Sequence, residues 1–203
     1  VEVTAHGGAR PSHAVWQGRR YHRGGAVDYL GRHYEDFESA TGYGTGAGLC
    51  GWNCRHTFFV VFPELGSPPA WTQESLEALN ARSIEYDGRL YTRYEISQMQ
   101  RARERTVRKW KRRYLAEDAA GADATASAVK LRQARAELND FVSLTAGRVD
   151  SARTSVHGFG RSEASRASYT ARKQERLDAV NNDLTSLREN GKIKLTGTAV
   201  SPP

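Results

Sequence analysis

The sequence predicts an α+β protein: a small glycine-rich mixed β/loop module, then a basic helical hairpin and a third long helix. Residues 1–91 are rich in glycine, aromatic residues and histidine, and they lack long helical periodicity. From residue 92 onward, apolar residues recur at the spacing of amphipathic helices. We therefore divide the chain into an α+β module at 1–91, a helical hairpin at 92–145, and a linker, helix and tail at 146–203.

The first module is expected to contain short strands separated by loops. Alternation of apolar and polar residues predicts a strand in 1–6, and residues 14–22 resemble a hairpin with Gly18 near its turn. Residues 34–49 read as a glycine-rich loop. The strongest strand candidate is "HTFFVVFP" at 56–63, which ends at a proline.

Two further local signals close this module. Thr72 or Ser75 can cap a short helix over 73–82. Residues 84–92 contain two β-prone runs around Asp87-Gly88, the dipeptide preferred in two-residue hairpin turns. We expect a helix followed by a β-hairpin.

The helical half begins at Thr92, which forms a capping-box pattern with Glu95. We expect the first helix to run to about Asp118 and a small-residue turn to follow it. The second helix carries an amphipathic stripe, and its members are Leu131, Ala134, Leu138, Phe141, Val142 and Thr145. Two such helices joined by a short turn predict an antiparallel hairpin.

A third helix is expected over about 163–189 and stops near Gly191, a residue type that commonly ends helices. Its apolar residues lie on a heptad-like seam, consisting of Leu177, Val180, Leu184 and Leu187. Residues 192–203 are expected to form a short strand and a frayed end.

The net charge of +7 is unevenly distributed. Residues 1–91 are slightly acidic, whereas 92–145 and 146–203 are both basic. Eight basic residues crowd one stretch of the first long helix: Arg101, Arg103, Arg105, Arg108, Lys109, Lys111, Arg112 and Arg113. Such a face can neutralise phosphates without sequence preference or dock on an acidic protein surface. A solvated face remains the plain alternative.

No secretion or membrane signal is visible. The longest apolar run covers residues 58–62, far shorter than the roughly 20 residues of a membrane-spanning helix. The chain begins "VEVTAHGG", without an initiator methionine or an apolar leader, which we interpret as a piece of a longer chain. Two cysteines do not make a disulfide framework, so a reducing compartment is the default expectation.

The stretch "GLCGWNCRHTFF" holds both cysteines and permits three interpretations. A zinc site would use Cys50, Cys54 and His56, with His13 or His6 upstream, although the spacing lacks the paired knuckles of common zinc motifs. A thiol nucleophile would pair Cys54 with a histidine base. A packed structural knot would need no cofactor, and this is the interpretation that we favour, with zinc as the alternative.

Three segments resemble the C-terminal part of the minor capsid protein 2 family of tailed phages, which is more distantly related to the Mu F-like head morphogenesis proteins. They are "PSHAVWQG", "YEDFESATGYGTGAGLCGWNCRHTFFVVFP" and "YTRYEISQMQRARERTVRKWKRRY". The similarity runs from about residue 1 to 145. Residues 146–203 resemble no family that we can name.

This resemblance implies a structural virion protein rather than an enzyme, located in the phage head and in the host cytoplasm during assembly. Its expected partners are the portal, other head proteins and packaged DNA, with no membrane. A zinc- or thiol-dependent hydrolase and a free nucleic-acid-binding module are the alternatives. We expect a structural polar and aromatic cluster of His13, Trp16, Gln17, Asn53, Cys54, Arg55 and His56.

Overall fold

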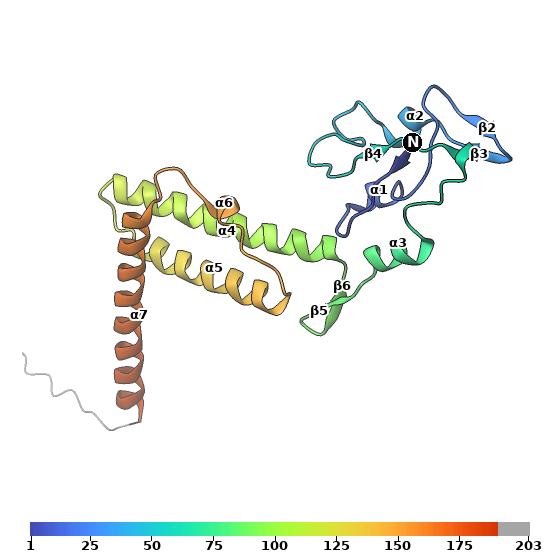
Figure 1. Ribbon diagram of the computed structural model, residues 1–203. Coiled ribbons are helices and arrows are strands. Elements are labelled where there is room, and N and C mark those ends of the chain that lie inside the picture. Colours follow the sequence, from blue (N-terminus) through green and yellow to red (C-terminus); the bar gives the residue numbers. More distant parts are fainter. Residues whose placement is uncertain (191–203) are drawn as a thin grey trace, which may run out of the picture. The chain divides into compact units, whose positions relative to one another are not determined.

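The computed structural model describes residues 1–190 and has the predicted α+β composition (Figure 1). It divides into two compact units, one formed by residues 1–99 and one beginning at residue 100. The first unit contains β1 (Glu2–Val3), α1 (Pro11–Ala14), β2 (Val27–Tyr29), β3 (Arg32–Tyr34), α2 (Phe37–Thr41), β4 (Phe58–Phe59), the 3-10 helix η1 (Pro63–Leu65), α3 (Gln73–Asn80), β5 (Ile84–Tyr86) and β6 (Arg89–Tyr91). The remaining helices are α4 (Arg93–Ala119), α5 (Thr125–Leu144), α6 (Ser151–Thr154) and α7 (Arg161–Glu189).

The core of the first unit is small and aromatic. Val3, Tyr21, Phe37 and Leu49 are buried together, and Phe58 packs against them. β1 and β4 form an antiparallel pair in which Val3 lies opposite Phe58, so this pair supplies one wall of the core. Short strands suffice here because α2 and the loops contribute the other core residues, Phe37, Tyr21 and Leu49.

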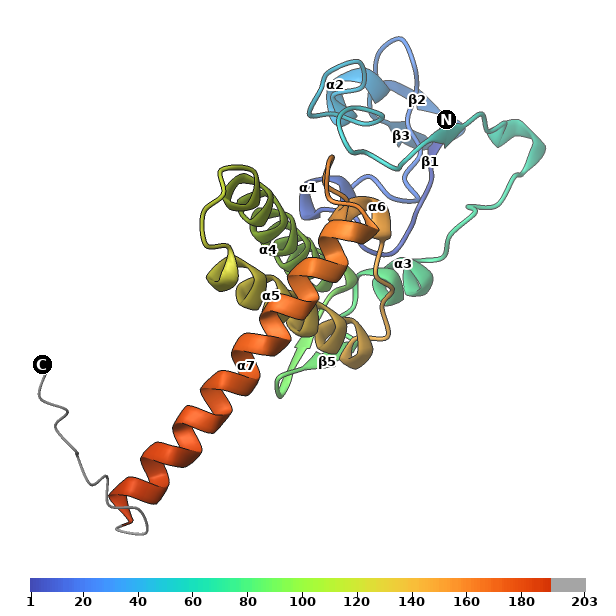
Figure 2. The ribbon, with the colours of Figure 1, turned by 90° about the vertical axis from the view of Figure 1, so that its left-hand side faces the viewer.

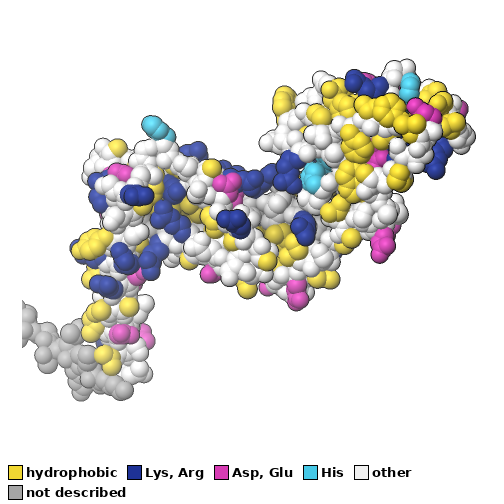
Figure 3. Space-filling view, in the orientation of Figure 1, with side chains coloured by type: hydrophobic (Ala, Val, Ile, Leu, Met, Phe, Trp, Pro, Cys, Tyr) yellow, Lys and Arg dark blue, Asp and Glu magenta, His cyan; other side chains and the backbone are white. Residues whose placement is uncertain are grey.

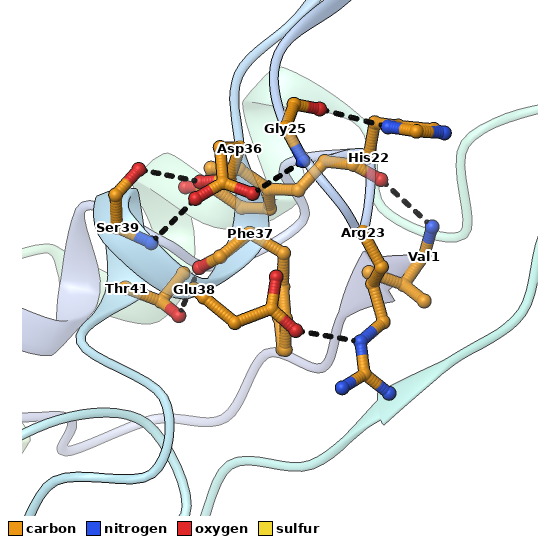
Figure 4. Close-up of polar contacts among 10 residues, drawn as sticks. Val1, His22, Arg23, Gly25, Asp36, Phe37, Glu38, Ser39 and Thr41 are labelled. Carbon is orange, nitrogen blue, oxygen red and sulfur yellow. Dashed lines mark hydrogen bonds and ion pairs between the residues drawn. The ribbon is translucent and has the colours of Figure 1, made fainter.

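Polar contacts hold the segment between β3 and α2 in place (Figure 4). Asp36 caps α2: its carboxylate accepts hydrogen bonds from the backbone N–H groups of Ser39 and Gly25, each at 2.9 Å. The Ser39 N–H is the main reason that the pKa of Asp36 lies below its usual value. Arg23 forms an ion pair with Glu38 at 2.8 Å and lies over the ring of Phe37. These contacts fix the turn that positions Phe37 in the core.

A buried ion pair joins β1 to distant loops. Glu2 is fully buried and pairs with Arg20 at 2.8 Å. Its second carboxylate oxygen accepts a hydrogen bond from the backbone N–H of Ala70 at 2.8 Å. The Arg20 guanidinium also donates to the carbonyl groups of Ser67 and Pro68. Because every one of these groups is partnered, the burial of this charge is compensated.

Three expectations for the first module are corrected. The hairpin at 14–22 is wrong, because α1 is followed by a turn and Gly18 and Arg19 hydrogen-bond to Val3 of β1 instead of to each other. The strand at 56–63 shrinks to two residues, because β1, its partner, is itself two residues long. The loop at 34–49 contains a helix, α2, which begins at the Asp36 cap.

Other local expectations are confirmed. Thr72 caps α3 by accepting the backbone N–H of Ser75. β5 and β6 form the hairpin around Asp87 and Gly88, whose φ angles of 51° and 69° are those that the two-residue turn requires. The dipeptide could be recognised because few other residues tolerate positive φ at both positions.

The second unit is built from long helices. From residue 100 onward α4 runs beside α5 in the opposite direction, as Figures 1 and 2 both show, which confirms the helical hairpin. The buried face of α5 has the predicted residues, Leu131, Ala134, Leu138, Phe141, Val142 and Thr145. α7 packs on α5 through the buried residues Ala167 and Ala171, both small enough to let the helices approach closely.

The heptad-like seam of α7 lies on the part of the helix that extends past α5 (Figure 2). Leu177, Val180 and Leu184 are about half exposed. The strand expected within 192–203 lies outside the described residues. No helix among the described residues is long and apolar enough to cross a membrane.

Candidate functional sites: a buried histidine cluster and a basic helix face

A tightly folded glycine loop supports the first site. The backbone N–H of Leu49 donates to the Thr41 carbonyl at 3.0 Å, which returns the chain to the end of α2 and buries Leu49 in the core. A Cβ atom added to Gly48 would lie 1.8 Å from the carbonyl oxygen of Gly42. Only glycine permits this approach. Close backbone packing therefore explains the glycine at position 48.

The histidine cluster lies beside this loop. His13 on α1, Gln17 just after it and His56 just before β4 are each at most 3% exposed. Gln17 Nε2 donates to His56 Nε2 and to the His6 carbonyl, both at 2.9 Å. His13 Nε2 lies 3.0 Å from the carbonyl oxygen of Ala47, so this imidazole holds the glycine loop against α1.

A thiol completes the cluster. Cys54 Sγ lies 3.5 Å from His56 Nδ1. The Trp16 ring covers His13, with 4.3 Å between ring centroids. Cys54 and His56 are two residues apart, just before β4, and their contact shows that both side chains lie on one side of the chain. The sequence segments 13–17 and 54–56 thus meet as one site.

Both buried histidines of the cluster have lowered pKa values, which keep the His56 ring neutral near neutral pH. Burial, followed by the nearby His6, lowers the pKa of His56 from 6.5 to about 4. Burial also lowers the pKa of His13. A neutral imidazole can accept a hydrogen bond or ligate a metal through one ring nitrogen. It cannot supply the imidazolium charge that stabilises a reactive thiolate.

Some of the expected cluster residues lie at its edge. Asn53 is exposed and adopts a φ of 56°, so it serves the turn. Arg55 is also exposed, and its guanidinium donates to the Gly7 carbonyl at 3.4 Å and lies 3.2 Å from His6 Nδ1. Cys50 is exposed, with Sγ 3.4 Å from the His56 carbonyl oxygen.

Arg10 was missed by the sequence analysis. Its guanidinium donates to the carbonyl group of Trp52 at 2.6 Å and ties the glycine loop to the residue preceding α1. Nothing in the local sequence distinguishes this arginine from the others of the first unit, since its partner is a backbone carbonyl 42 residues away.

Three side chains of the cluster could share a metal ion. The ligand atoms of His13, Cys54 and His56 all lie within 4.8 Å of one another. His6 and Cys50, also candidates from the sequence, lie outside this group of three. The structure thus separates the five candidate ligands by geometry.

The second site is the basic face of α4, and packing divides its eight basic residues into two sets. Arg103 stacks on the Phe141 ring at 4.1 Å, Arg108 donates to the Arg153 carbonyl, and Lys111 donates to the Thr154 carbonyl at 2.6 Å. Lys111 is buried, and this burial lowers its pKa. Arg113 forms an ion pair with Glu117 at 2.8 Å. The first three side chains thus join α4 to other segments of the second unit, and Arg113 is neutralised within α4.

The other four form an exposed row that we call the basic row: Arg101, Arg105, Lys109 and Arg112. Their spacing of four, four and three residues places them on one face of α4. No ion pair within residues 1–190 involves any of them. Dark blue side chains of the helical unit in Figure 3 show how much of its surface is basic.

The comparisons with known proteins identify the class. The family model described as "Phage minor capsid protein 2" matches residues 1–143, which include both sites. The chain therefore belongs to the phage minor capsid protein 2 family, a family of structural proteins of the bacteriophage virion. Membership implies contact with other phage head proteins. Searches of curated proteins and of solved structures gave no significant match.

Proposed function

We propose that this minor capsid protein acts in head assembly near the portal and that the basic row of α4 binds packaged DNA. The observation that carries the proposal is the row itself. Four cationic side chains follow one another along an exposed helix face, whereas three of their basic neighbours contact other segments of the second unit and the fourth, Arg113, is paired with Glu117. A set that served solubility alone would not need to be gathered on one face.

The geometry of the row suits a polyanion. Residues four apart on a helix are separated by about 6 Å along its axis. Double-stranded DNA presents one negative charge per about 1.7 Å of its axis, so several phosphates lie within reach of such a row. Contacts of this kind release counterions and carry no sequence preference. That is the binding mode expected of a protein that meets packaged DNA of any sequence.

The test is DNA binding measured as fluorescence anisotropy over a range of salt concentrations. If four phosphates are neutralised, the logarithm of the binding constant falls with the logarithm of salt concentration with a slope of about −3.6. Replacing Arg101, Arg105, Lys109 and Arg112 by glutamine should weaken binding at least about tenfold and flatten this slope toward zero.

The matched control carries four equivalent changes on α7, at the exposed residues Arg172, Lys173, Arg176 and Arg188. Both variants have the same net charge, so a general charge effect would weaken them equally. DNA binding that is weakened equally in the α4 and α7 variants would contradict the proposal that the basic row binds DNA. A wild-type protein that binds an acidic polypeptide but not DNA would contradict it as well.

We further propose that the Cys54–His56 pair is structural and not catalytic. Support comes from the low pKa of His56, about 4, which keeps the imidazole neutral. An activated thiol requires a nearby base that holds the proton it removes. The same neutral state is compatible with hydrogen bonding and with metal ligation.

A further inference from the structure

We propose that His13, Cys54 and His56 bind a zinc ion that fastens α1 and its glycine loop to the segment leading into β4. The inference does not depend on DNA binding by α4, which belongs to other residues. It rests on the arrangement of three ligand atoms within 4.8 Å of one another in a buried cluster.

The separation between the Cys54 and His56 ligand atoms agrees with tetrahedral coordination, and the His13 ligand atom, within 4.8 Å of both, moves closer when the ion binds. Zinc binds thiolate sulfur at about 2.3 Å and imidazole nitrogen at about 2.0–2.1 Å, which places the two ligand atoms about 3.6 Å apart. The observed separation between Cys54 Sγ and His56 Nδ1 is 3.5 Å. Imidazole and thiolate ligands favour zinc over magnesium or calcium, both of which prefer oxygen.

A hydrogen bond to the backbone already orients the His13 ring for metal binding. His13 Nε2 donates to the Ala47 carbonyl at 3.0 Å, which leaves Nδ1 as the nitrogen with a free lone pair. Ligating histidines commonly donate their second N–H to a backbone carbonyl in this way. The glycine loop therefore fixes the orientation of the His13 ring through the Ala47 carbonyl.

The other histidine must exchange a proton on binding. Because Gln17 Nε2 donates to His56 Nε2, the His56 proton lies on Nδ1, facing Cys54. Zinc replaces the proton of the Cys54 thiol, which is released to solvent. The His56 proton moves to Nε2, and Gln17 turns Oε1, buried and without a partner, to accept it. That rotation removes a donor from the His6 carbonyl, so His6 is expected to shift.

His6 lies beside His56 and is our candidate for the fourth coordination position. Its ring centroid lies 4.3 Å from that of His56, and its Nε2 is buried without a hydrogen-bond partner. A buried polar atom in this state calls for a partner. His6 after a small shift, or a water molecule between His6 and the metal, completes the tetrahedron.

The test is the metal content of the full chain, purified without an affinity tag that binds metals, incubated with zinc and desalted. Elemental analysis should find about one zinc per chain, the stoichiometry of a single tetrahedral site. Cys54→Ser removes the only sulfur ligand with little change in size and should lower zinc binding by at least about tenfold. Cys50→Ser is the matched control and should retain wild-type zinc.

Replacing zinc by cobalt gives a second measurement, which reports the ligands of the metal and not only the amount of metal bound. The wild-type and Cys50→Ser proteins should show a thiolate-to-cobalt charge-transfer band, and Cys54→Ser should lack it while keeping the near-ultraviolet circular dichroism of the folded protein. Chelator should lower the melting temperature of wild type but not of Cys54→Ser, because zinc stabilises only the folded state.

Three results would overturn the proposal. The first is a wild-type protein that retains no zinc above the desalting background. The second is equal zinc loss in the Cys50 and Cys54 variants. The third is a cobalt spectrum that lacks the thiolate band.

Discussion

At the residue scale, the glycine loop depends on Gly48, whose missing side chain lets two backbone segments touch. Its Cα hydrogen faces the carbonyl group of Gly42, and the surrounding loop carries His13's partner, Ala47. Gly44, in the same loop, has room for a side chain, because a Cβ atom there would meet nothing within 4 Å. Its φ of 88°, however, is one that residues other than glycine rarely adopt. One glycine is needed for space, and the other for backbone conformation.

We expect Gly48→Ala to destabilise the first unit more than Gly44→Ala does. The Gly44 substitution should cost about 1–2 kcal/mol, the usual penalty of a left-handed conformation for an L-residue. The Gly48 substitution should exceed this, because the carbonyl of Gly42 belongs to backbone and cannot rotate away. Denaturant unfolding followed by tryptophan fluorescence measures both. Equal stability losses would show that the loop can open to accept a side chain.

Packing also decides the use of individual arginines. Arg105 and Arg103 are two positions apart on α4, yet one is exposed and the other stacks on Phe141. Helical periodicity predicts that Arg103 and Arg105 lie on different faces of α4. It does not reveal that α5 places the ring of Phe141 against Arg103. This is why the sequence could predict a basic helix and not its four-residue exposed row.

At the element scale, the start of α4 is held by a reciprocal cap. Thr92 Oγ1 accepts the backbone N–H of Glu95 at 3.2 Å, and the Glu95 carboxylate accepts the backbone N–H of Thr92 at 2.8 Å. The hydrogen bond from the Thr92 N–H is the main reason that the pKa of Glu95 is lowered. The predicted capping box is confirmed.

Thr92→Ala should cost about 1 kcal/mol of stability, the typical worth of a threonine cap. Thr106→Ala is the control within the same helix: its hydroxyl bonds only the Ala102 carbonyl one turn back, and alanine is the better helix former. We therefore expect no loss at 106. Thermal unfolding followed by circular dichroism provides the comparison, and a loss at position 106 as large as at 92 would argue against a capping effect.

The same cap has a pH dependence with a defined sign. A carboxylate whose pKa is lower in the folded state stabilises that state above its unfolded pKa, here 4.5. This stabilisation disappears as the pH falls below 4.5 through the folded pKa. Thr92→Ala keeps the backbone N–H but loses the hydroxyl group, which donates to the Glu95 carboxylate at 3.0 Å and also lowers its pKa. Wild type should thus lose more stability on acidification than Thr92→Ala, as measured by thermal unfolding at a series of pH values.

The sequence predicts the helix α7 but not the residues through which it packs on α5. Leu177, Val180 and Leu184 recur at heptad-like spacing, and the helix is confirmed over Arg161–Glu189. Its buried contact with α5 instead uses Ala167 and Ala171, near the beginning of the helix. Small residues allow close approach, whereas the larger ones remain half exposed.

At the scale of the whole molecule, each unit has its own core. Val3, Tyr21, Phe37 and Leu49 form that of the first unit, and α5 supplies most of the buried apolar residues of the second. Separate cores permit separate unfolding, so a single two-state description is not expected to hold for the chain.

We expect two unfolding transitions that mutations shift independently. Gly48→Ala should lower the transition seen by near-ultraviolet circular dichroism of the aromatic first unit. The transition seen in helical signal, which α4, α5 and α7 dominate, should stay within experimental error. Leu138→Ala, in the buried face of α5, should do the reverse and cost about 2–5 kcal/mol of the second unit's stability. Coincident shifts of both probes would indicate one cooperative unit.

The sequence by itself determined the features that depend on neighbours in the chain. The Asp87-Gly88 turn, the Thr92 capping box, the apolar stripe of α5 and the basic character of α4 all follow from spacing, because the interacting groups are only a few residues apart. The family resemblance also belongs here, since ordered motifs carry it.

The tertiary structure alone decided what depends on distant partners. It brought His13 and Gln17 to Cys54 and His56, returned residues 18–20 to β1, and withdrew Arg103, Arg108 and Lys111 from the basic face. Such contacts join residues separated by tens of positions, often through a backbone carbonyl that has no signature in the side-chain pattern. Local spacing cannot encode them, because the energy that selects them is gained only when the whole core closes.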